Sequence, residues 1–282
     1  MHQYWKTNFV LKRITNKLYG KQIFNNLYAH NGQIGTISIS YDMDYKKDVE
    51  SIPLLIDIMK THSIKASFAV VGMYVEEFPE IHKEIVRRKH EIVNHTYSHP
   101  YNDELKTPKY RSLTTKEKEN EISKCNTICN KLLKTKPLGF RFPHFGSEFE
   151  VSVYDILEKE KMLYSSSTTS SVSGHIAPFK VRKNLYEFPV TSCPKHFYSP
   201  FDTFHSFRSP TTKHSKSEFF DIFAKLIDMS LERKQILNIY VDPLDIISNR
   251  LGKIFEIIND KGIKTLTMLD TVKKLAGKYN TP

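Results

Sequence analysis

The sequence predicts an α/β fold, in which a mainly parallel sheet forms either a barrel or an open sheet that closes over on itself. Short β-type runs alternate with helical patterns from residue 34 onward, which is the signature of βα units. Roughly seven or eight such units are present, too many for a small sandwich. The 282 residues, 39% of them hydrophobic, are enough for one large domain with a substantial core. We therefore expect one barrel-type domain rather than two small ones.

The first three units follow from the spacing of apolar residues. Residues 34–41 alternate apolar and polar side chains and predict a strand. Ser51 as N-cap and Pro53 in the first turn predict the start of the next helix. Two more strands are expected at residues 66–71 and 91–94, with a helix after Pro79 between them.

The second half of the chain continues this alternation. Thr114, with Glu117 three positions later, resembles a capping box that opens a helix. The apolar face of that helix carries Cys125 and Cys129, which we therefore expect in the core. Further strands are expected at residues 139–142, 162–166, 185–189, 236–241 and 263–266. Further helices are expected at residues 151–161, 217–231, 248–260 and 269–276.

Composition argues against several classes of protein. The chain has three cysteines and no CxxC pair, so neither a disulfide framework nor a cysteine zinc site is expected. The first residues lack the apolar core of a secretory signal, and no run of about 18 uncharged apolar residues occurs. The net charge of +11 suits an anionic partner, but without a recognisable motif we do not expect nucleic acid. We expect a cytoplasmic protein, with membrane contact at most peripheral.

Residues 1–31 precede the first predicted strand and form a basic N-terminal extension, which leaves residues 32–282 as the barrel domain. An apolar stripe flanked by lysines and arginines is typical of a segment that lies on an anionic membrane surface. The alternative is packing against the barrel, which we favour because such segments often cover a barrel end. The stripe consists of Trp5, Phe9, Val10, Ile14 and Leu18.

Polar clusters follow four of the predicted strands, with the sequences YDMDY, HTYSHPY, RFPHF and DPLD. In an α/β fold, reactive residues gather at the carboxyl ends of strands. His95 and His99 are four residues apart, so a helical turn would point both imidazoles toward one metal ion. With a carboxylate from Asp42 or Asp44, they would leave coordination positions open for water and substrate, as a catalytic metal requires. Solvent-facing loop histidines and turn aspartates remain the alternative.

These clusters resemble the successive motifs of a known family. SISYDMDY, the run ASFAVVGMYVEEFPEIHKEIVRRKHEIVNHTYSHP, and GFRFPHFG are similar to those of the polysaccharide deacetylases, also called NodB-homology deacetylases or carbohydrate esterase family four. The resemblance extends from about residue 34 to about residue 270 and is most specific at HEIVNHTYSH. It implies a distorted, incomplete (β/α) barrel of about seven strands, which agrees with the count of βα units.

The resemblance implies a role for each residue of the first clusters. Asp42 matches the general base, and Arg141 matches the arginine that orients and tunes it. Asp44, His95 and His99 match the metal ligands. The implied reaction removes an acetyl or similar acyl group from an N-acetylated sugar or glycan, by metal-activated water with Asp42 as base. Zinc is the default metal for these ligands, and nickel, cobalt and iron remain open.

Substrate contacts are expected from two loops. Pro143 and His144 fall in an RxPY-like motif, where the resemblance implies that His144 offers its backbone N–H to the oxyanion. The aromatic loop 198–210 carries His205 and Arg208 and predicts a substrate rim, with Arg208 meeting an anionic group. A plain surface loop is the alternative. The implied partner is a carbohydrate, either a glycan or a lipid-linked or nucleotide-linked sugar.

One expected catalytic histidine is missing. In LNIYVDPLDI, Asp242 stands where the family has a late-strand histidine that protonates the departing amine. An aspartate beside a metal is ordinarily ionised and is a poor proton donor near neutrality. Three explanations are open. Burial could make Asp242 a proton donor; His144, His175 or His205 could reach in from a loop; or the protein could bind without efficient turnover.

Other functions share these residues. One alternative is an amidohydrolase that acts on a small non-sugar amide, and another is a catalytically impaired, glycan-binding member of the family. Non-haem iron oxygenases also use two histidines and one carboxylate. Their usual order does not fit a chain in which Asp44 precedes the HxxxH pair across βα units.

Overall fold

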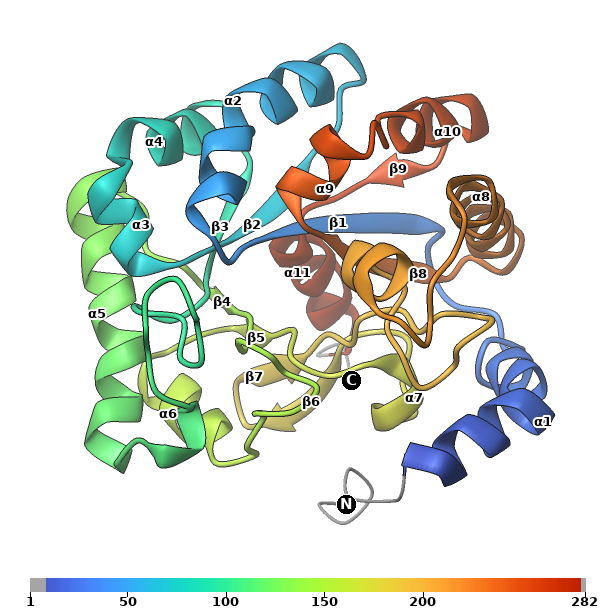
Figure 1. The fold of residues 1–282 in the computed structure, drawn as a ribbon, viewed down its shortest axis with the longest axis horizontal. Helices are drawn as coiled ribbons and strands as arrows, with labels where there is room; N and C mark the ends of the chain where they lie inside the picture. Colours follow the sequence, from blue (N-terminus) through green and yellow to red (C-terminus); the bar gives the residue numbers. More distant parts are fainter. Residues whose placement is uncertain (1–8, 280–282) are drawn as a thin grey trace.

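Strand β1 (Thr36–Met43) lies within a curled sheet that runs through the computed structural model, which describes residues 9–279 (Figure 1). The hydrogen-bonded order is β6-β7-β5-β4-β3-β2-β1-β8, and β9 also pairs with β1. The strands pair in parallel, except that β6 is antiparallel to β7. The predicted α/β fold with an incomplete barrel is confirmed. The other strands are β2 (Ala66–Val70), β3 (Glu91–Asn94), β4 (Gly139–Phe140), β5 (Tyr164–Ser165), β6 (Phe179–Arg182), β7 (Leu185–Glu187), β8 (Ile236–Val241) and β9 (Lys264–Thr265).

Helices cover the outer side of the curled sheet, and α11 lies on its inner side (Figure 1). There, Met268 and Val272 of α11 pack in one cluster with Ala69 and Val93 of two neighbouring strands. The helices are α1 (Phe9–Leu27), α2 (Lys46–Thr61), α3 (Gly72–Glu77), α4 (Pro79–Arg87), α5 (Thr115–Leu133), α6 (Val153–Lys159), α7 (Ser170–Ser173), α8 (Lys216–Arg233), α9 (Pro243–Ser248), α10 (Lys253–Lys261) and α11 (Met268–Tyr279), with a 3-10 turn η2 (Tyr110–Ser112) and a π-helical turn η3 (Phe204–Arg208).

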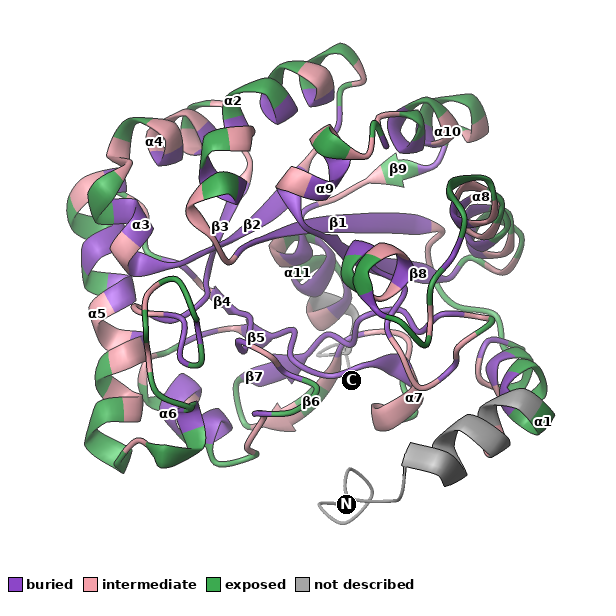
Figure 2. Ribbon diagram, viewed as in Figure 1, coloured by how far each residue is buried: buried purple, intermediate pink, exposed green. Residues whose placement is uncertain are grey.

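Every residue of β1 is buried, because the strand is covered on both faces. Ile37 and Tyr41 belong to the largest core cluster, between the sheet and the outer helices. The small hydroxyl residues between them face the inner side, where Ser38 Oγ lies 2.9 Å from Thr271 Oγ1. Figure 2 shows the same contrast for the molecule, with the central strands buried, β6 and β9 partly exposed, and outer helices that are exposed on one side.

The structure differs from the sequence prediction at the start of α2 and at short elements. Helix α2 begins at Lys46 with Tyr45 as N-cap, so Ser51, predicted as the N-cap, lies inside the helix. Strands β4, β5 and β9 have two residues each. After β4, a backbone group donates to a side chain instead of to a neighbouring strand, since Phe142 N–H donates to Ser167 Oγ. Strand β6 and helices α3 and α9 are absent from the prediction, since four to six residues are too few to show a periodicity. The helix predicted from residue 248 begins at Lys253, because Arg250 has a left-handed backbone with φ 52°.

Helix α1 packs the end of the N-terminal extension against the barrel. Phe24 of α1 and Tyr28, the residue directly after this helix, lie in the largest core cluster, and their rings stack with centroids 4.3 Å apart. Tyr28 Oη lies 3.0 Å from Ser170 Oγ. Of the predicted apolar stripe, Leu18 is 64% exposed, whereas the side chains at positions 5, 9, 10 and 14 lie outside the described part of the chain.

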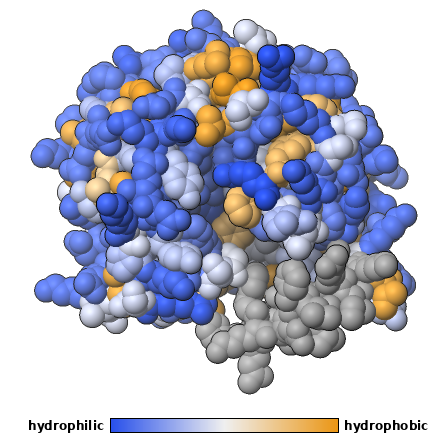
Figure 3. Space-filling view, viewed as in Figure 1, coloured by the Kyte–Doolittle hydropathy of each residue, from blue (hydrophilic) through white to orange (hydrophobic). Residues whose placement is uncertain are grey.

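Hydrophilic side chains cover most of the face seen in Figure 3, and apolar ones form only small groups on it. Among residues 9–279, no helix has the length and apolar character needed to cross a membrane.

The sheet stays open between β8 and the chain that follows β7. Here the Asn238 side chain of β8 donates from Nδ2 to the carbonyls of Phe188 and Pro189, at 3.0 and 3.1 Å. Thr191 adds a backbone contact, since its N–H donates to the Asn238 carbonyl at 2.8 Å. We call these four residues the Asn238 seam. A side-chain amide thus joins the two edges where a closed barrel would have a ladder.

Candidate active site

Three side chains with metal-ligating atoms meet at the carboxyl ends of β1 and β3. Asp44 directly follows β1, His95 directly follows β3, and His99 lies four residues further on. Asp44 Oδ1 lies 3.0 Å from His95 Nε2 and 3.2 Å from His99 Nε2, and both imidazoles are buried. The ligand atoms of the three residues predicted as metal ligands lie within 4.8 Å of one another.

The hydrogen bonds of the two imidazoles decide which nitrogens face inward. His95 Nδ1 lies 2.7 Å from the Arg141 carbonyl, so it donates its proton there and leaves Nε2 toward Asp44. His99 Nε2 is buried and, although it is 3.2 Å from Asp44, has no hydrogen bond of good geometry. A buried nitrogen without a hydrogen bond, beside a carboxylate and a second imidazole, fits the binding of a divalent cation.

The loop between the two histidines is not the helical turn expected from their spacing. Thr96, His99 and Tyr101 have left-handed backbones, with φ 67°, 49° and 71°. This conformation is uncommon outside glycine and costly for a β-branched residue such as threonine. Two hydrogen bonds offset the cost, from Thr96 N–H to Asn94 Oδ1 at 2.8 Å and from His99 N–H to Thr96 Oγ1 at 3.1 Å. A strained loop, rather than a helix, therefore brings the imidazoles together.

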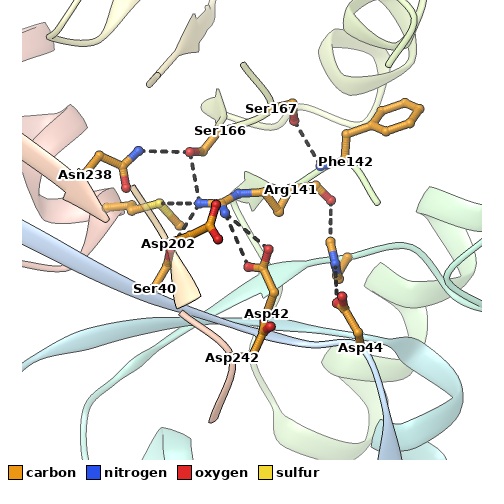
Figure 4. A network of polar contacts seen from close by, with 12 residues as sticks. Ser40, Asp42, Asp44, Arg141, Phe142, Ser166, Ser167, Asp202, Asn238 and Asp242 are labelled. Carbon is orange, nitrogen blue, oxygen red and sulfur yellow. Dashed lines mark hydrogen bonds and ion pairs between the residues drawn. The ribbon is translucent and has the colours of Figure 1, made fainter. Parts of the chain in front are cut away.

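Asp42 lies within β1 and faces the guanidinium of Arg141 (Figure 4). Arg141 Nη1 lies 3.3 Å from both carboxylate oxygens of Asp42. Arg141 Nη2 donates to the hydroxyls of Ser40 and Ser166, at 3.0 and 3.1 Å. The structure thus brings together Asp42 and Arg141, which the motifs predicted to act as a pair.

The two aspartates of this cluster have pKa values shifted in opposite directions. Burial raises the pKa of Asp42, and the nearby charge of Arg141 offsets only part of that rise. Burial would also raise the pKa of Asp44, but the charge of His99 and the hydrogen bond from His95 outweigh it and hold this pKa well below its usual range. Asp42 therefore accepts a proton more readily than Asp44, which stays ionised.

Asp242 occupies the position of the missing histidine, between β8 and α9. Because β8 and β1 pair in parallel, Asp242 lies beside Asp42 at the same end of two adjacent strands. Arg208 forms an ion pair with Asp242 and a second one, at 3.1 Å, with Asp245. The guanidinium expected to meet an anionic substrate group is thus paired with two carboxylates of the protein.

His205 lies in η3, which adjoins this strand end through the hydrogen bond from Asp242 N–H to Thr203 Oγ1 at 3.0 Å. Asp202 Oδ2 lies 2.7 Å from His205 Nδ1, and Asp202 Oδ1 accepts from the His205 N–H at 2.6 Å. Burial lowers the pKa of His205, but the charge and hydrogen bond of Asp202 outweigh burial and raise it. The sequence analysis missed Asp202, although the D-x-x-H spacing in FDTFH is a signal that could have found it.

His144 and His175, also considered as proton donors, occupy different places. The His144 ring lies edge-on to His99, with centroids 5.0 Å apart, and its Nε2 lies 3.1 Å from the Tyr101 carbonyl. Burial lowers the pKa of His144, and Pro143 beside it is buried. His175 lines a cavity at the amino end of β8, whereas Asp242 lies at the carboxyl end of that strand. The structure therefore brings His144 into the site and leaves His175 outside it.

Comparison with known sequences finds similar proteins for the first half of the chain. A family model for polysaccharide deacetylases matches residues 29–162. A peptidoglycan-N-acetylglucosamine deacetylase of Bacillus cereus is 34% identical over 117 residues, which are 42% of this chain and 40% of that protein. A chitooligosaccharide deacetylase of a Bradyrhizobium species is 35% identical over 66 residues, which are 23% of this chain and 30% of that protein. The chain spans less than half the length of these relatives.

Solved structures share the fold over most of the chain. A polysaccharide deacetylase-like protein from Mycobacterium smegmatis has a TM-score of 0.70 at 15% identity, covering 90% of this chain and 96% of that one. An allantoinase has a TM-score of 0.70 at 12% identity, covering 90% and 97%. A carbohydrate esterase family four pseudoenzyme from Bacillus anthracis has a TM-score of 0.51 at 16% identity, covering 86% and 68%. Residues 29–162, which contain the first four strands, thus match the polysaccharide deacetylase family model, and the solved structures show that the rest of the chain completes the same fold.

Proposed function

We propose that this protein is a metal-dependent hydrolase that removes an acetyl or similar acyl group from an N-acetylated sugar or glycan. The observation that supports this function is the buried Asp42–Arg141 pair beside the trio of Asp44, His95 and His99. The matched relatives are deacetylases of peptidoglycan and of chitooligosaccharides, which favours a glycan built from N-acetylated sugars.

Asp44, His95 and His99 would hold the cation, because their ligand atoms converge and His99 Nε2 has no hydrogen bond of its own. A divalent cation there supplies Lewis-acid chemistry, which polarises an acyl carbonyl and lowers the pKa of a water molecule. We propose zinc, since imidazole and carboxylate ligands with an open position are typical of catalytic zinc.

Asp42 acts as the general base in this proposal. It takes a proton from the attacking water, whose oxygen then adds to the acyl carbon. Burial, which raises the pKa of Asp42, makes the carboxylate a better proton acceptor near neutrality. Arg141 fixes the orientation of Asp42, and the backbone N–H of His144 is assigned as a donor to the developing oxyanion.

We assign the general acid to His205 rather than to Asp242. The ion pair with Arg208 favours the carboxylate form of Asp242, which has no proton to give. Asp202 raises the pKa of His205 and so keeps more of its imidazole protonated near neutrality. The contact of Thr203 with Asp242 supports a position for His205 at this end of the barrel.

The test is acetate release from N-acetylglucosamine oligomers by the zinc-loaded protein. We expect Asp42→Asn to abolish release and His205→Gln to lower kcat by about 10²- to 10⁴-fold, the usual contribution of one proton-transfer group. His175→Gln, at the other end of the barrel, is the matched histidine control and should leave kcat unchanged. A zinc-loaded wild type that releases no acetate from any N-acetylated sugar would contradict the proposal.

A second candidate, a glycan-binding protein with impaired turnover, is favoured by one observation. Asp242 replaces the expected histidine and is paired with Arg208, and one protein of the same fold is itself described as a pseudoenzyme. Asp242→His separates the two candidates. A large gain in acetate release would support impaired turnover, whereas equal or lower release would support His205 as the working acid.

A further inference from the structure

A second group of metal-ligating side chains lies outside the candidate active site. Cys193 Sγ lies 3.5 Å from His214 Nε2 and 3.9 Å from His196 Nδ1. The ligand atoms of these three residues lie within 4.8 Å of one another. Cys193 and His214 are 2% and 5% exposed, whereas His196 is partly exposed. A soft sulfur and two imidazoles converge here without any role in the proposed reaction.

Backbone N–H groups already point at the sulfur. Cys193, Pro194, Lys195 and His196 form a tight turn in which His196 N–H lies 3.4 Å from Cys193 Sγ. The backbone N–H of Lys195 also points at this sulfur. Burial raises the pKa of the Cys193 thiol to about 11, and these hydrogen bonds, which favour a thiolate, offset part of that rise. The sulfur thus already has two N–H donors directed at it.

The outer nitrogen of His214 lies near a carboxylate. His214 Nδ1 is 3.3 Å from Glu218 Oε2, without a hydrogen bond of good geometry, and Nε2 lies on the side of Cys193. Glu218 is itself held by Lys195, whose Nζ lies 2.6 Å from Oε1. A carboxylate near the outer nitrogen of a ligating histidine can accept its proton and so favour the tautomer that leaves the inner nitrogen for a metal. The ligand atoms are thus in place, with a carboxylate within reach of the outer nitrogen of His214.

We propose that Cys193, His196 and His214 bind one zinc ion. Thiolate and imidazole are donors that zinc prefers, and with three protein ligands the fourth position of the tetrahedron is open to a water molecule. On binding, a zinc–sulfur bond forms, the S–H bond of Cys193 breaks, and its proton passes to solvent. This site revises the expectation that the cysteines take no part in metal binding. That expectation considered cysteine pairs and overlooked the C-x-x-H spacing.

The zinc ion would join the two ends of one segment. His196 precedes and His214 follows the residues that carry Asp202, His205 and Arg208. His214 N–H already donates to the Ser206 carbonyl at 2.7 Å, so the end of the segment is tied to η3. The zinc site itself does not depend on the proposed function. Its effect on catalysis does, because it acts by positioning the segment that holds the assigned acid.

Metal content and cobalt spectroscopy of the full chain test the site. We expect two zinc ions per chain in the wild type, one in Cys193→Ala and one in Asp44→Ala. Cobalt-loaded wild type should show a thiolate-to-cobalt charge-transfer band in the near ultraviolet, because this proposed site has a sulfur ligand and the site of Asp44, His95 and His99 has none. Cys193→Ala should lose the band, and Cys129→Ala, the matched change at another buried free cysteine, should keep it.

The outcomes separate this site from the active site. Asp44→Ala should lose acetate release and keep the thiolate band, so failure of the proposed function leaves the zinc proposal testable. His196→Gln, at a partly exposed position, serves as a second variant if Cys193→Ala does not fold. Chelation should also speed hydrogen exchange in residues 197–213. A cobalt-loaded wild type without the band, or equal zinc contents in wild type and Cys193→Ala, would overturn the proposal.

Discussion

Arg141 carries a full positive charge in a place that water does not reach. Its side chain is fully buried, and Asp42 is its anionic partner, while Ser40 and Ser166 accept hydrogen bonds from Nη2. A buried ion pair adds little net stability, but removing one partner leaves an uncompensated charge in the interior. The orientation of Asp42 and the stability of the inner side of the barrel therefore depend on the same guanidinium.

Arg141→Ala should lower the free energy of unfolding by about 3–5 kcal/mol, because it leaves the Asp42 carboxylate buried without a cation. Urea denaturation followed by circular dichroism measures the change. Lys159→Ala, which breaks the exposed pair of Lys159 with Glu119, should cost about 1 kcal/mol or less and is the control. Equal losses in the two variants would show that Arg141 does not neutralise a buried charge.

The assigned acid predicts a defined pH dependence. His205 faces Asp202 and Arg208, with His196 further away, and its folded-state pKa lies above the ordinary value of 6.5. Because the acid must be protonated, kcat/KM should be intact below that pKa and fall as pH rises through it. Asp202→Asn removes the charge that raises this pKa, so the alkaline limb should move to lower pH. A pH–rate profile of both proteins checks this, and an unmoved limb would exclude His205.

The sequence predicted that the polar residues after β1 and β3 belong to the site, because each cluster directly follows a strand with a clear apolar pattern. Asp44, His95 and His99 therefore meet as expected, and Asp42 meets Arg141. Asp202 could not be predicted as firmly. Its contact with His205 is local, but its relation to the site arises only where η3 packs against the end of β8.

At the scale of elements, four helices end at or just before a lysine with a left-handed backbone. Glycine is the usual residue at such a position, because it has no Cβ to clash with the following carbonyl. The lysine charge partly compensates by interacting favourably with the negative end of the helix dipole. The four residues are Lys89, Lys134, Lys161 and Lys234, with φ 60°, 55°, 58° and 52°.

Lys134→Gly, at the end of α5, should therefore raise the free energy of unfolding by about 1 kcal/mol, because glycine adopts this backbone without the Cβ clash. Lys131→Gly, three residues earlier and inside the same helix, should lower it by about 1 kcal/mol. Both positions are exposed, so lost packing does not confuse the comparison. Chemical denaturation of the two variants gives the signs, and changes of the same sign would refute this account of the helix ends.

Elements with strong local signals were predicted, and short ones were not. The capping box of α5 is present, with Thr114 N–H donating to Glu117 Oε2 at 2.7 Å, and both cysteines of its apolar face are buried. Helices α3 and α9 and strand β6 have too few residues for a pattern, and they form through contacts with neighbouring elements, as when β6 pairs with β7. The left-handed loop before His99 is another case, since its strain is offset by contacts that spacing does not reveal.

For the whole molecule, buried histidines predict sensitivity to acid. His82 is fully buried with Nδ1 2.8 Å from the Phe78 carbonyl, and burial lowers its pKa to about 4. Because the unfolded chain binds the proton more readily, this stabilising contribution is present above the ordinary value of 6.5 and is lost as pH falls from there to about 4.

The loss should approach roughly 3 kcal/mol for His82, from about 1.4 kcal/mol per unit of pKa difference. Unfolding free energies measured between neutral and acidic pH should fall less steeply for His82→Leu than for the wild type. His175→Gln, at the protein surface, should leave the slope unchanged. Identical slopes in wild type and His82→Leu would contradict the role of His82.

The barrel as a whole was predictable because βα alternation repeats along the chain and restricts the topology. The contact between its two edges was not predictable. The Asn238 side-chain amide joins β8 to the chain after β7, and its carbonyl partners lie some 50 residues earlier in the sequence. The second metal-ligating group was missed for a related reason. His214 joins Cys193 and His196 only after the segment between them folds back.

The Asn238 seam links barrel opening to the reaction centre. Asn238 Nδ2 also donates to Ser166 Oγ at 3.0 Å, and the same hydroxyl accepts from Arg141 (Figure 4). If the two edges separate at this gap, Ser166 shifts and Arg141 loses a hydrogen bond that holds it. Asp42 would then be misaligned while most of the secondary structure is still intact. Heat inactivation should then precede melting. Acetate release and ellipticity recorded along one temperature ramp would show two separate midpoints, whereas coincident midpoints would mean that the proton acceptor loses its alignment only when the whole fold does.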